Sequence, residues 1–326
     1  MMPLLFDRFA DWRAEVTTTG QPLWQPVLDY ELSQKGRTAE EVWRGLAQAY
    51  AVMKDAIETG LTQDMQSHSG MINNGAKKIR DCSISVLGPQ FQLLLARTTA
   101  AKEVNSCMGR VVAAPTAGAS GIMPGILMHL QDLHELPDSK IHEGMLVAAG
   151  IALIIERRAS IAGAVGGCQA ETGTAAAMGA GAIVYCLGGT VEQVFDAVAI
   201  TIMNMMGLIC DPVAGLVEVP CVKRNGSGAV IAFAAAQTAL AGDPSIIPVD
   251  EVVDAMGEVG YAMDTRYKET ALGGIAATPT AQAIAERVLI NPAEVVDEMD
   301  ETGVAPPGEH RDETDELGLA PPTPLG

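Results

Sequence analysis

The sequence Gly166-Gly167-Cys168-Gln169-Ala170-Glu171 is the first of three cysteine segments between Ala162 and Arg224. The others are Leu208-Ile209-Cys210-Asp211-Pro212 and Val219-Pro220-Cys221-Val222-Lys223. Their spacing, 42 and then 11 residues, is too irregular for a zinc ribbon or a disulfide ladder. Glycine beside Cys168 lets the backbone approach a bulky ligand closely, and Pro212 is expected to end a helix that carries Cys210. Three thiolates without a fourth would leave one metal position open, which is typical of a catalytic site.

The apolar residues of the chain repeat with the period of a helix, and no run alternates strictly from residue to residue. Gly and Ala are abundant and aromatic residues make up only 4%, which favours closely packed helices. The sequence therefore predicts an all-α fold: a single Gly/Ala-rich helical catalytic domain with buried core helices and a site built by loops. Expected helices include Leu87–Cys107, Ile126–Leu133, Met145–Ile155, Ala229–Leu240 after a turn at Asn225–Gly228, and Pro248–Met256.

The chain divides into three parts by composition. Residues 1–60 are expected to form an N-terminal helical arm, in which a capping box at Thr38–Glu41 opens a helix that ends near Gly60. A second capping box lies at Thr190–Gln193, within the catalytic domain of residues 61–290. Residues 291–326 are acidic and rich in proline, and this composition predicts a disordered tail.

Charge and cysteine content exclude several classes of protein. The net charge of −19 argues against nucleic acid and anionic membrane surfaces as partners. Two uncharged stretches, Thr172–Val191 and Asn225–Gly242, are rich in Gly, Ala and Thr, and this predicts buried core helices rather than membrane spans. No secretory signal is evident, and six sparsely spaced cysteines indicate a reducing compartment, so we expect a cytoplasmic protein. The remaining cysteines are interpreted as small buried hydrophobes: Cys82, Cys107 and Cys186.

Two further segments are candidate walls of a substrate pocket. Ser69-Gly70, with Asn73-Asn74-Gly75 after it, is either a turn whose N–H groups and hydroxyl bind a carboxylate or an ordinary surface turn. Ala113–Gly125 holds too many Gly and Pro residues for a helix interior, so a functional loop is expected there. Thr116 and Ser120 supply hydroxyl groups to this loop.

The cysteine segments, the run Glu103–Gly125 and the run Glu269–Thr280 resemble the catalytic alpha subunit of the iron–sulfur-dependent L-serine dehydratases, also called L-serine ammonia-lyases. The resemblance covers residues 66–290 and includes several long motifs. Family members usually have a Gly-Gly-Asp-like turn where this chain has Asn73-Asn74-Gly75. This departure bears on the identity of the substrate.

The resemblance implies a [4Fe–4S] cluster held by Cys168, Cys210 and Cys221, with one open iron that acts as a Lewis acid on the hydroxyl of L-serine. A base would remove the α-proton, and elimination followed by hydrolysis would give pyruvate and ammonia. This lyase reaction belongs to amino-acid degradation and gluconeogenesis. Fold and resemblance together imply an all-α catalytic subunit with a beta (regulatory) subunit or a second copy of the chain as partner.

Further site residues follow from the same resemblance and from position in the chain. Arg110 either binds the substrate carboxylate bidentately or pairs with an acid on a helix. Lys223 and His68 are candidates for the catalytic base by their positions. The full set of implied substrate-binding residues is Ser69, Gly70, Asn105, Arg110, Thr116, Gly118, Ser120 and Thr278.

Other functions remain open at this level. A cysteine desulfidase or another β-elimination lyase would use the same cluster, and only substrate tests distinguish it. A non-catalytic iron–sulfur sensor or subunit would not need the hydroxyl-rich loops, and a membrane protein would partition into detergent. Pyridoxal-phosphate chemistry is disfavoured because no lysine motif is followed by a glycine-rich phosphate loop. The tail contains no cysteine that could reach the cluster and block it.

Overall fold

The computed structural model describes residues 6–290, and these residues form thirteen α-helices and no strand. The all-α prediction is therefore confirmed, whereas the tail predicted to be disordered lies outside the described residues. The helices are α1 (Phe9–Thr19), α2 (Gln25–Lys35), α3 (Ala39–Thr62), α4 (Gly75–Asp81), α5 (Pro89–Ser106), α6 (Ile122–His134), α7 (Asp138–Ala159), α8 (Gly163–Gly166), α9 (Thr174–Cys186), α10 (Val191–Met205), α11 (Cys221–Leu240), α12 (Val249–Ala262) and α13 (Pro279–Ile290).

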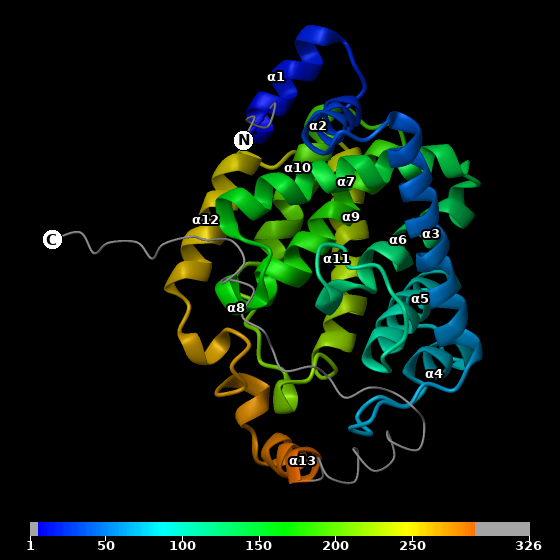
Figure 1. The fold of residues 1–326 in the computed structure, drawn as a ribbon, viewed down its shortest axis with the longest axis vertical. Coiled ribbons are helices and arrows are strands. Elements are labelled where there is room, and N and C mark those ends of the chain that lie inside the picture. The colour runs from blue at the N-terminus through cyan, green and yellow to red at the C-terminus, as the bar shows by residue number, and fades with distance from the viewer. Residues whose placement is uncertain (1–5, 291–326) are drawn as a thin grey trace, which may run out of the picture.

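Helix α9 is the centre of the fold, with α7, α10 and α11 packed around it (Figure 1). Every residue of α9 except Tyr185 is buried. Its glycines let neighbouring helices approach closely: a Cβ atom at Gly179 would lie 2.3 Å from Ile126 Cδ1, and one at Gly181 would lie 2.3 Å from Ile151 Cδ1. The prediction of helices packed through small residues is confirmed by these contacts.

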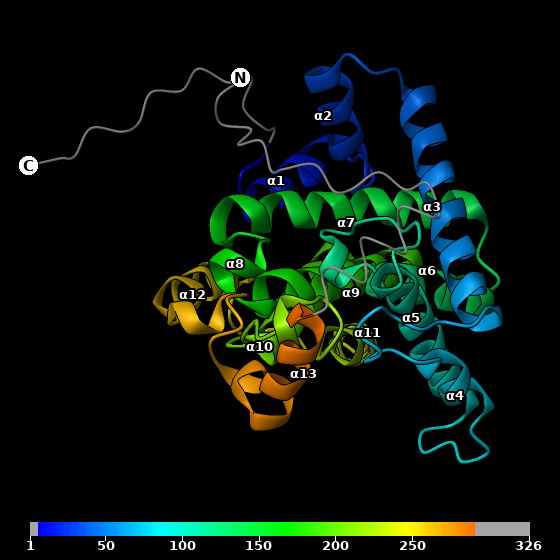
Figure 2. The ribbon, with the colours of Figure 1, turned by 60° about the horizontal axis from the view of Figure 1, so that its bottom comes forward.

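The N-terminal helices pack onto this core from the far side of α7. Figure 2 shows α7 between α1 and α2 on one side and α9 and α10 on the other. Trp12 of α1 stacks on Phe6, with ring centroids 4.9 Å apart, and lies 5.6 Å from the ring of Phe195 in α10. Asp250 of α12 accepts hydrogen bonds from the backbone N–H groups of Phe9 and Ala10, which open α1. Residues 6–19 therefore share the core with the central helices.

Both predicted capping boxes are present, at Thr38 and Thr190. The helix that Thr38 opens continues to Thr62, so the expected end at Gly60 is wrong. Gly60 is buried, and a Cβ atom there would lie 2.4 Å from the carbonyl oxygen of Ala100 in α5. This glycine serves the crossing of two helices rather than the end of one.

Three predicted boundaries near the cysteines are also wrong. Helix α10 ends at Met205, so Cys210 lies in a non-helical segment beyond it. Asn225–Gly228 is part of α11 and not a turn. The side chain of Asn225 bonds to the backbone of Gly118 and Gly121, and Gly228 lets the helix lie close to Ile122 of α6. The loop after Ala113 ends where α6 begins at Ile122, with Pro124 in the first turn, where proline is tolerated.

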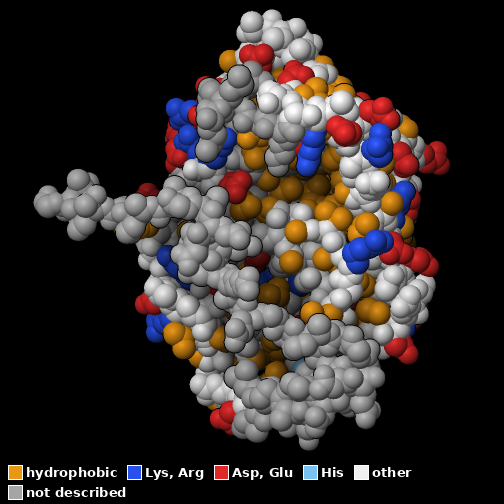
Figure 3. Space-filling view, viewed as in Figure 1, with side chains coloured by type: hydrophobic (Ala, Val, Ile, Leu, Met, Phe, Trp, Pro, Cys, Tyr) orange, Lys and Arg blue, Asp and Glu red, His pale blue; other side chains and the backbone are white. Residues whose placement is uncertain are grey.

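Hydrophobic side chains gather in the hollowed middle of the face seen in Figure 3, and charged side chains lie mainly around its edge. Among residues 6–290, no helix combines the length and the apolar character needed to cross a membrane. The two uncharged stretches correspond largely to α9 and α11, whose inward faces are buried.

Candidate functional site

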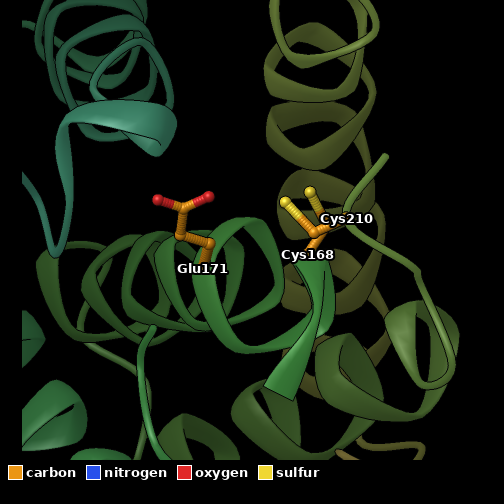
Figure 4. A group of neighbouring side chains, drawn as sticks. All are labelled: Cys168, Glu171 and Cys210. Carbon is orange, nitrogen blue, oxygen red and sulfur yellow. The ribbon is translucent and has the colours of Figure 1, made fainter. Parts of the chain in front are cut away.

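The structure brings two of the three predicted cysteines together with a carboxylate. Cys168 precedes a π-helical turn, η2 (Gln169–Gly173), and Cys210 lies in the segment after α10. One ligand atom from each of Cys168, Cys210 and Glu171 lies within 4.8 Å of the others. Figure 4 shows the two sulfur atoms side by side, with the carboxylate of Glu171 turned toward the same space.

The third cysteine, Cys221, is the first residue of α11, and its thiol is also buried and free. Burial is the main cause that raises the pKa of Cys221 to about 12, and the neighbouring Cys168 raises it further. Cys221 is therefore buried within reach of the charge of Cys168, while Cys168 and Cys210 lie side by side.

The backbone before Cys168 is fixed by tight packing. Gly167 has φ +77°, and a Cβ atom there would lie 2.7 Å from Met263 Sδ and 2.9 Å from the carbonyl oxygen of Leu208. Gln169 then donates a hydrogen bond from Nε2 to the carbonyl oxygen of Met256 at 2.8 Å and accepts one at Oε1 from the N–H of Gly207. Only glycine therefore fits at position 167. The two hydrogen bonds of the Gln169 side chain hold the backbone next to Cys168 against α12 and the segment after α10.

Cys210 is held by main-chain hydrogen bonds to residues far along the chain. Its N–H donates to the carbonyl oxygen of Tyr267 at 2.8 Å, and its carbonyl oxygen accepts from the N–H of Glu269 at 2.9 Å. This pairing brings the run Glu269–Thr280 to the site. Glu269 is exposed, so the site reaches solvent along this edge.

Two glycines border the space between the sulfurs and the carboxylates. A Cβ atom at Gly163 would lie 3.2 Å from Cys210 Sγ and 3.3 Å from both Glu171 Oε2 and Glu269 Oε2. A Cβ atom at Gly118 would lie 2.5 Å from Glu171 Oε1. Side chains at these positions would fill the space that the ligand atoms surround. The donors, three buried thiols with a carboxylate beside them, fit an iron–sulfur group or another thiophilic metal centre.

The two adjacent thiols differ in their proton affinity. The hydrogen bond with Cys210 and the guanidinium of Arg224 lower the pKa of Cys168, against the effect of burial. The same hydrogen bond and burial raise the pKa of Cys210. Cys168 is therefore the more acidic member of the pair, and the thiolate is the form of cysteine that binds metals.

Glu171 and Lys102 place opposite charges in the same buried region. Burial raises the pKa of Glu171, and the hydrogen bond from Thr116 Oγ1, at 2.5 Å, opposes that rise. Lys102 of α5 is fully buried, and its Nζ donates to Asn105 Oδ1 and, at 3.0 Å, to the carbonyl oxygen of Val217. Burial lowers the pKa of Lys102 to about 8, although nearby Cys221, Glu171 and Glu218 favour its charged form.

Several residues implied by the family resemblance lie at this region. Thr116 and Gly118 adjoin Glu171, and Asn105 accepts a hydrogen bond from Lys102. Ser120 is fully buried, and its hydroxyl has no hydrogen-bond partner among the described residues. The loop that carries them is fixed by Asn225, which donates to the carbonyl oxygens of Gly118 and Cys221.

The turn that begins at Ser69 uses its polar groups within the protein. Ser69 Oγ donates to Glu218 Oε2 at 2.6 Å, whereas Gly70 is exposed with φ +75°. Glu103 accepts hydrogen bonds from the N–H groups of Gly75 (2.8 Å) and Ala76 (3.0 Å), which open α4. The N–H groups after Asn73-Asn74 therefore bind an internal carboxylate.

Four other sequence candidates have exposed side chains. Arg110 is 74% exposed and lies 3.9 Å from Asp55 on α3, which is the pairing with a helix acid that the sequence left open. His68, Lys223 and Thr278 are exposed as well. The structure does not bury any of these side chains with the cysteines.

Sequence reasoning did not single out Lys102, Glu171, Asp211 or Arg224. Arg224 follows Cys221 by one helical turn, and recognising α11 as starting at Cys221 would have placed both on one face. Glu171 stands three residues after Cys168 in a helical turn. Lys102 is a lysine within a run of Thr and Ala residues that are buried, and a cation in such a run is itself a signal.

Known proteins match most of the chain. Residues 18–276 match the family model described as "Serine dehydratase alpha chain". The L-serine dehydratase alpha chain of Peptoniphilus asaccharolyticus is 44% identical over 268 residues, covering 81% of this chain and 92% of that protein. The probable L-serine dehydratase alpha chain of Bacillus subtilis is 41% identical over 278 residues, covering 84% and 92%. An L-serine dehydratase of Streptomyces coelicolor is 40% identical over 258 residues, which cover 77% of this chain and 56% of that longer protein. The chain therefore belongs to the serine dehydratase alpha-chain family and is an enzyme of the lyase class.

Proposed function

We propose that the chain is an L-serine ammonia-lyase, which converts L-serine to pyruvate and ammonia with a [4Fe–4S] cluster held by Cys168, Cys210 and Cys221. The observation that carries the proposal is that the buried thiols of Cys168 and Cys210, from distant segments, lie with Glu171 around one glycine-bordered space. The buried, free thiol of Cys221 is near enough for the charge of Cys168 to raise its pKa. The names of the relatives, L-serine dehydratase alpha chains, support serine as the substrate.

When bound, such a cluster supplies an iron with an open coordination position, a Lewis acid for the hydroxyl group of serine. The protein contributes the shape and polarity around it. Gly163 and Gly118 leave room beside the ligand atoms, and the buried surroundings of Cys168 and Glu171 exclude bulk water. Exclusion of water strengthens every electrostatic interaction with a bound amino acid.

Removal of the α-proton needs a group that is partly unprotonated near neutral pH. Lys102 Nζ meets this need, since its pKa lies at about 8 and its side chain is buried beside Glu171 and Cys221. His68 and Lys223 stay proposals from their positions in the sequence, and both are exposed. We place the proton acceptor at Lys102 Nζ and assign Thr116 and Ser120 to the binding of the substrate's polar groups.

The family description "alpha chain" supports a beta chain as the partner of this protein. Free cysteines at the site support a reducing compartment such as the cytoplasm.

The test is anaerobic reconstitution of the full chain with iron and sulfide, alone and with a beta chain from a relative's organism. We expect visible iron–sulfur absorbance and release of pyruvate and ammonia in equal amounts from L-serine. Sulfide release from L-cysteine without turnover of serine would favour a desulfidase. A stable cluster without turnover of either amino acid would indicate a binding subunit, and absence of any cluster would refute the proposed ligand set.

A further inference from the structure

One guanidinium group, carried by the helix that Cys221 opens, contacts both of the other cysteine segments. Arg224 lies on α11 one turn after Cys221, and its side chain is only 15% exposed. Its Nη1 lies 3.6 Å from Cys168 Sγ and donates to the carbonyl oxygen of Ile209, the residue before Cys210, at 2.8 Å. The same nitrogen lies 2.7 Å from Oδ1 of Asp211, the residue after Cys210.

Asp211 fixes the position of this guanidinium. Its side chain is 1% exposed, and its Oδ2 accepts a hydrogen bond at 2.6 Å from the N–H of Ile275. Gly274, with φ +61°, packs so closely that a Cβ atom there would lie 2.2 Å from the same oxygen. The Oδ1 contact with Arg224 is an ion pair rather than an aligned hydrogen bond, so the arginine is the cation that balances this buried carboxylate.

Several acidic groups lie around Cys168, and they favour a cation beside it. The carboxylates of Glu171 and Glu269 lie beside the sulfurs, and metal binding requires further thiolates in the same buried space. A guanidinium stays charged at all relevant pH values and presents several N–H groups in a planar fork, which an ammonium cannot do.

We propose that Arg224, oriented by Asp211, is a positioning residue that holds the three cysteine segments in the arrangement that binds the metal group and balances its negative charge. This inference rests on the proposed metal site but not on the identity of the substrate. Arg224 also lines a surface cavity of about 450 Å³ together with Asn204, Met206 and Ser227, so small cations can reach its position from solvent.

The experiment compares Arg224→Gln, Arg224→Lys and the double variant Arg224→Gln/Asp211→Asn with the wild type after anaerobic reconstitution. The readouts are iron per chain, the midpoint potential of the bound cluster and the melting temperature of the metal-free protein. We expect iron affinity to fall about 10- to 100-fold in Arg224→Gln, as for other groups that support metal ligands. Arg224→Lys should recover part of the loss, and Arg44→Gln, an exposed arginine paired with Glu40, should cause none.

The double variant separates positioning from stability. Asp211→Asn removes the carboxylate that Arg224→Gln leaves unbalanced, so the melting temperature should recover while iron affinity stays low. Guanidinium at millimolar concentration should restore iron binding to Arg224→Ala through the solvent cavity, whereas sodium at the same ionic strength should not.

Wild-type iron content and midpoint potential in Arg224→Gln would overturn the inference, and so would recovery of iron affinity in the double variant. Failure of the wild type to release pyruvate from serine would leave these binding results unaffected, so the substrate proposal and the role of Arg224 fail separately.

Discussion

The turn η2 and helix α9 form one continuous helical segment, with the buried Cys168 just before its start, here called the site end, and the buried Cys186 at its last residue, here called the core end. The two cysteines differ in chemistry. Cys186, the last residue of α9, donates a hydrogen bond to the carbonyl oxygen of Lys140, and burial raises its pKa to about 12. Cys168, before the turn that leads into α9, lies beside Arg224 and Cys210 and has a lowered pKa. Burial by itself raises the pKa of a thiol and makes it unreactive, whereas a neighbouring thiol and a guanidinium from other segments lower the pKa of Cys168.

The largest expected difference between the two ends is in cofactor binding. Cys168→Ala should lower iron content and serine turnover at least 100-fold, because it removes a ligand from the proposed cluster. Cys186→Ala should keep both within twofold and cost about 1 kcal/mol of stability through the small cavity it leaves. Iron analysis, pyruvate release and thermal melting of both variants check this. A Cys168→Ala protein with full iron content and full turnover would contradict the proposal that Cys168, unlike Cys186, binds the cluster.

The glycines beside each cysteine provide a second contrast. Gly163→Ala adds a methyl group 3.2 Å from Cys210 Sγ, in the space that the ligand atoms surround. We expect iron affinity to fall about tenfold, as for other groups around metal ligands, with only a small change in the melting temperature of the metal-free protein. Titration with ferrous iron and thermal melting measure the two effects. A large loss of stability without loss of iron binding would mean that this space is ordinary packing.

The site end also carries an unfavourable buried charge that the core end lacks. Lys102 has a pKa of about 8 in the folded protein against 10.5 as the ordinary value, so the unfolded chain binds more protons between these pH values. Its contribution to stability is therefore most unfavourable below pH 8, by about 3 kcal/mol, and the penalty disappears as pH rises to 10.5. Lys102→Met should be more stable than the wild type at pH 7, and the difference should shrink toward pH 10.

Chemical unfolding of both metal-free proteins across this range measures the difference. The same variant should lose serine turnover if Lys102 Nζ accepts the α-proton, while iron binding is kept. A constant difference in stability at every pH would show that Lys102 is not a buried, shifted cation.

The smallest effect concerns packing at the core end. A Cβ atom at Gly144 of α7 would lie 2.6 Å from Cys186 Sγ, so Gly144→Ala should cost about 1–3 kcal/mol of stability. In a Cys186→Ala background the cost should shrink by about 1 kcal/mol, because the sulfur that the methyl group meets is gone. A double-mutant cycle by thermal or urea unfolding measures this coupling. Strict additivity would indicate that the helices separate instead of meeting at the sulfur.

Local patterns explain why much of the fold was predictable. The 3.6-residue period, the capping boxes at Thr38 and Thr190 and the abundance of Gly and Ala depend on neighbours within a few residues, and these predictions are confirmed. The errors at Gly60 and Asn225–Gly228 have one cause. The local pattern of glycines predicts breaks at both places, but helices of this bundle cross there and leave no room for a side chain.

The sequence by itself determined the helical class, the family resemblance and the choice of the three candidate cysteines, because each of these depends on short stretches of neighbouring residues. Only the tertiary structure decided that Arg224, Lys102 and Glu171 meet at the cysteines and that Glu103 occupies the N–H groups of the turn after Asn74. It also decided that Arg110 faces Asp55 at the surface. Lys102 and Cys221, whose charges act on each other, are 119 positions apart in the sequence. Their charges act through space, over distances that only the packing of the helices sets.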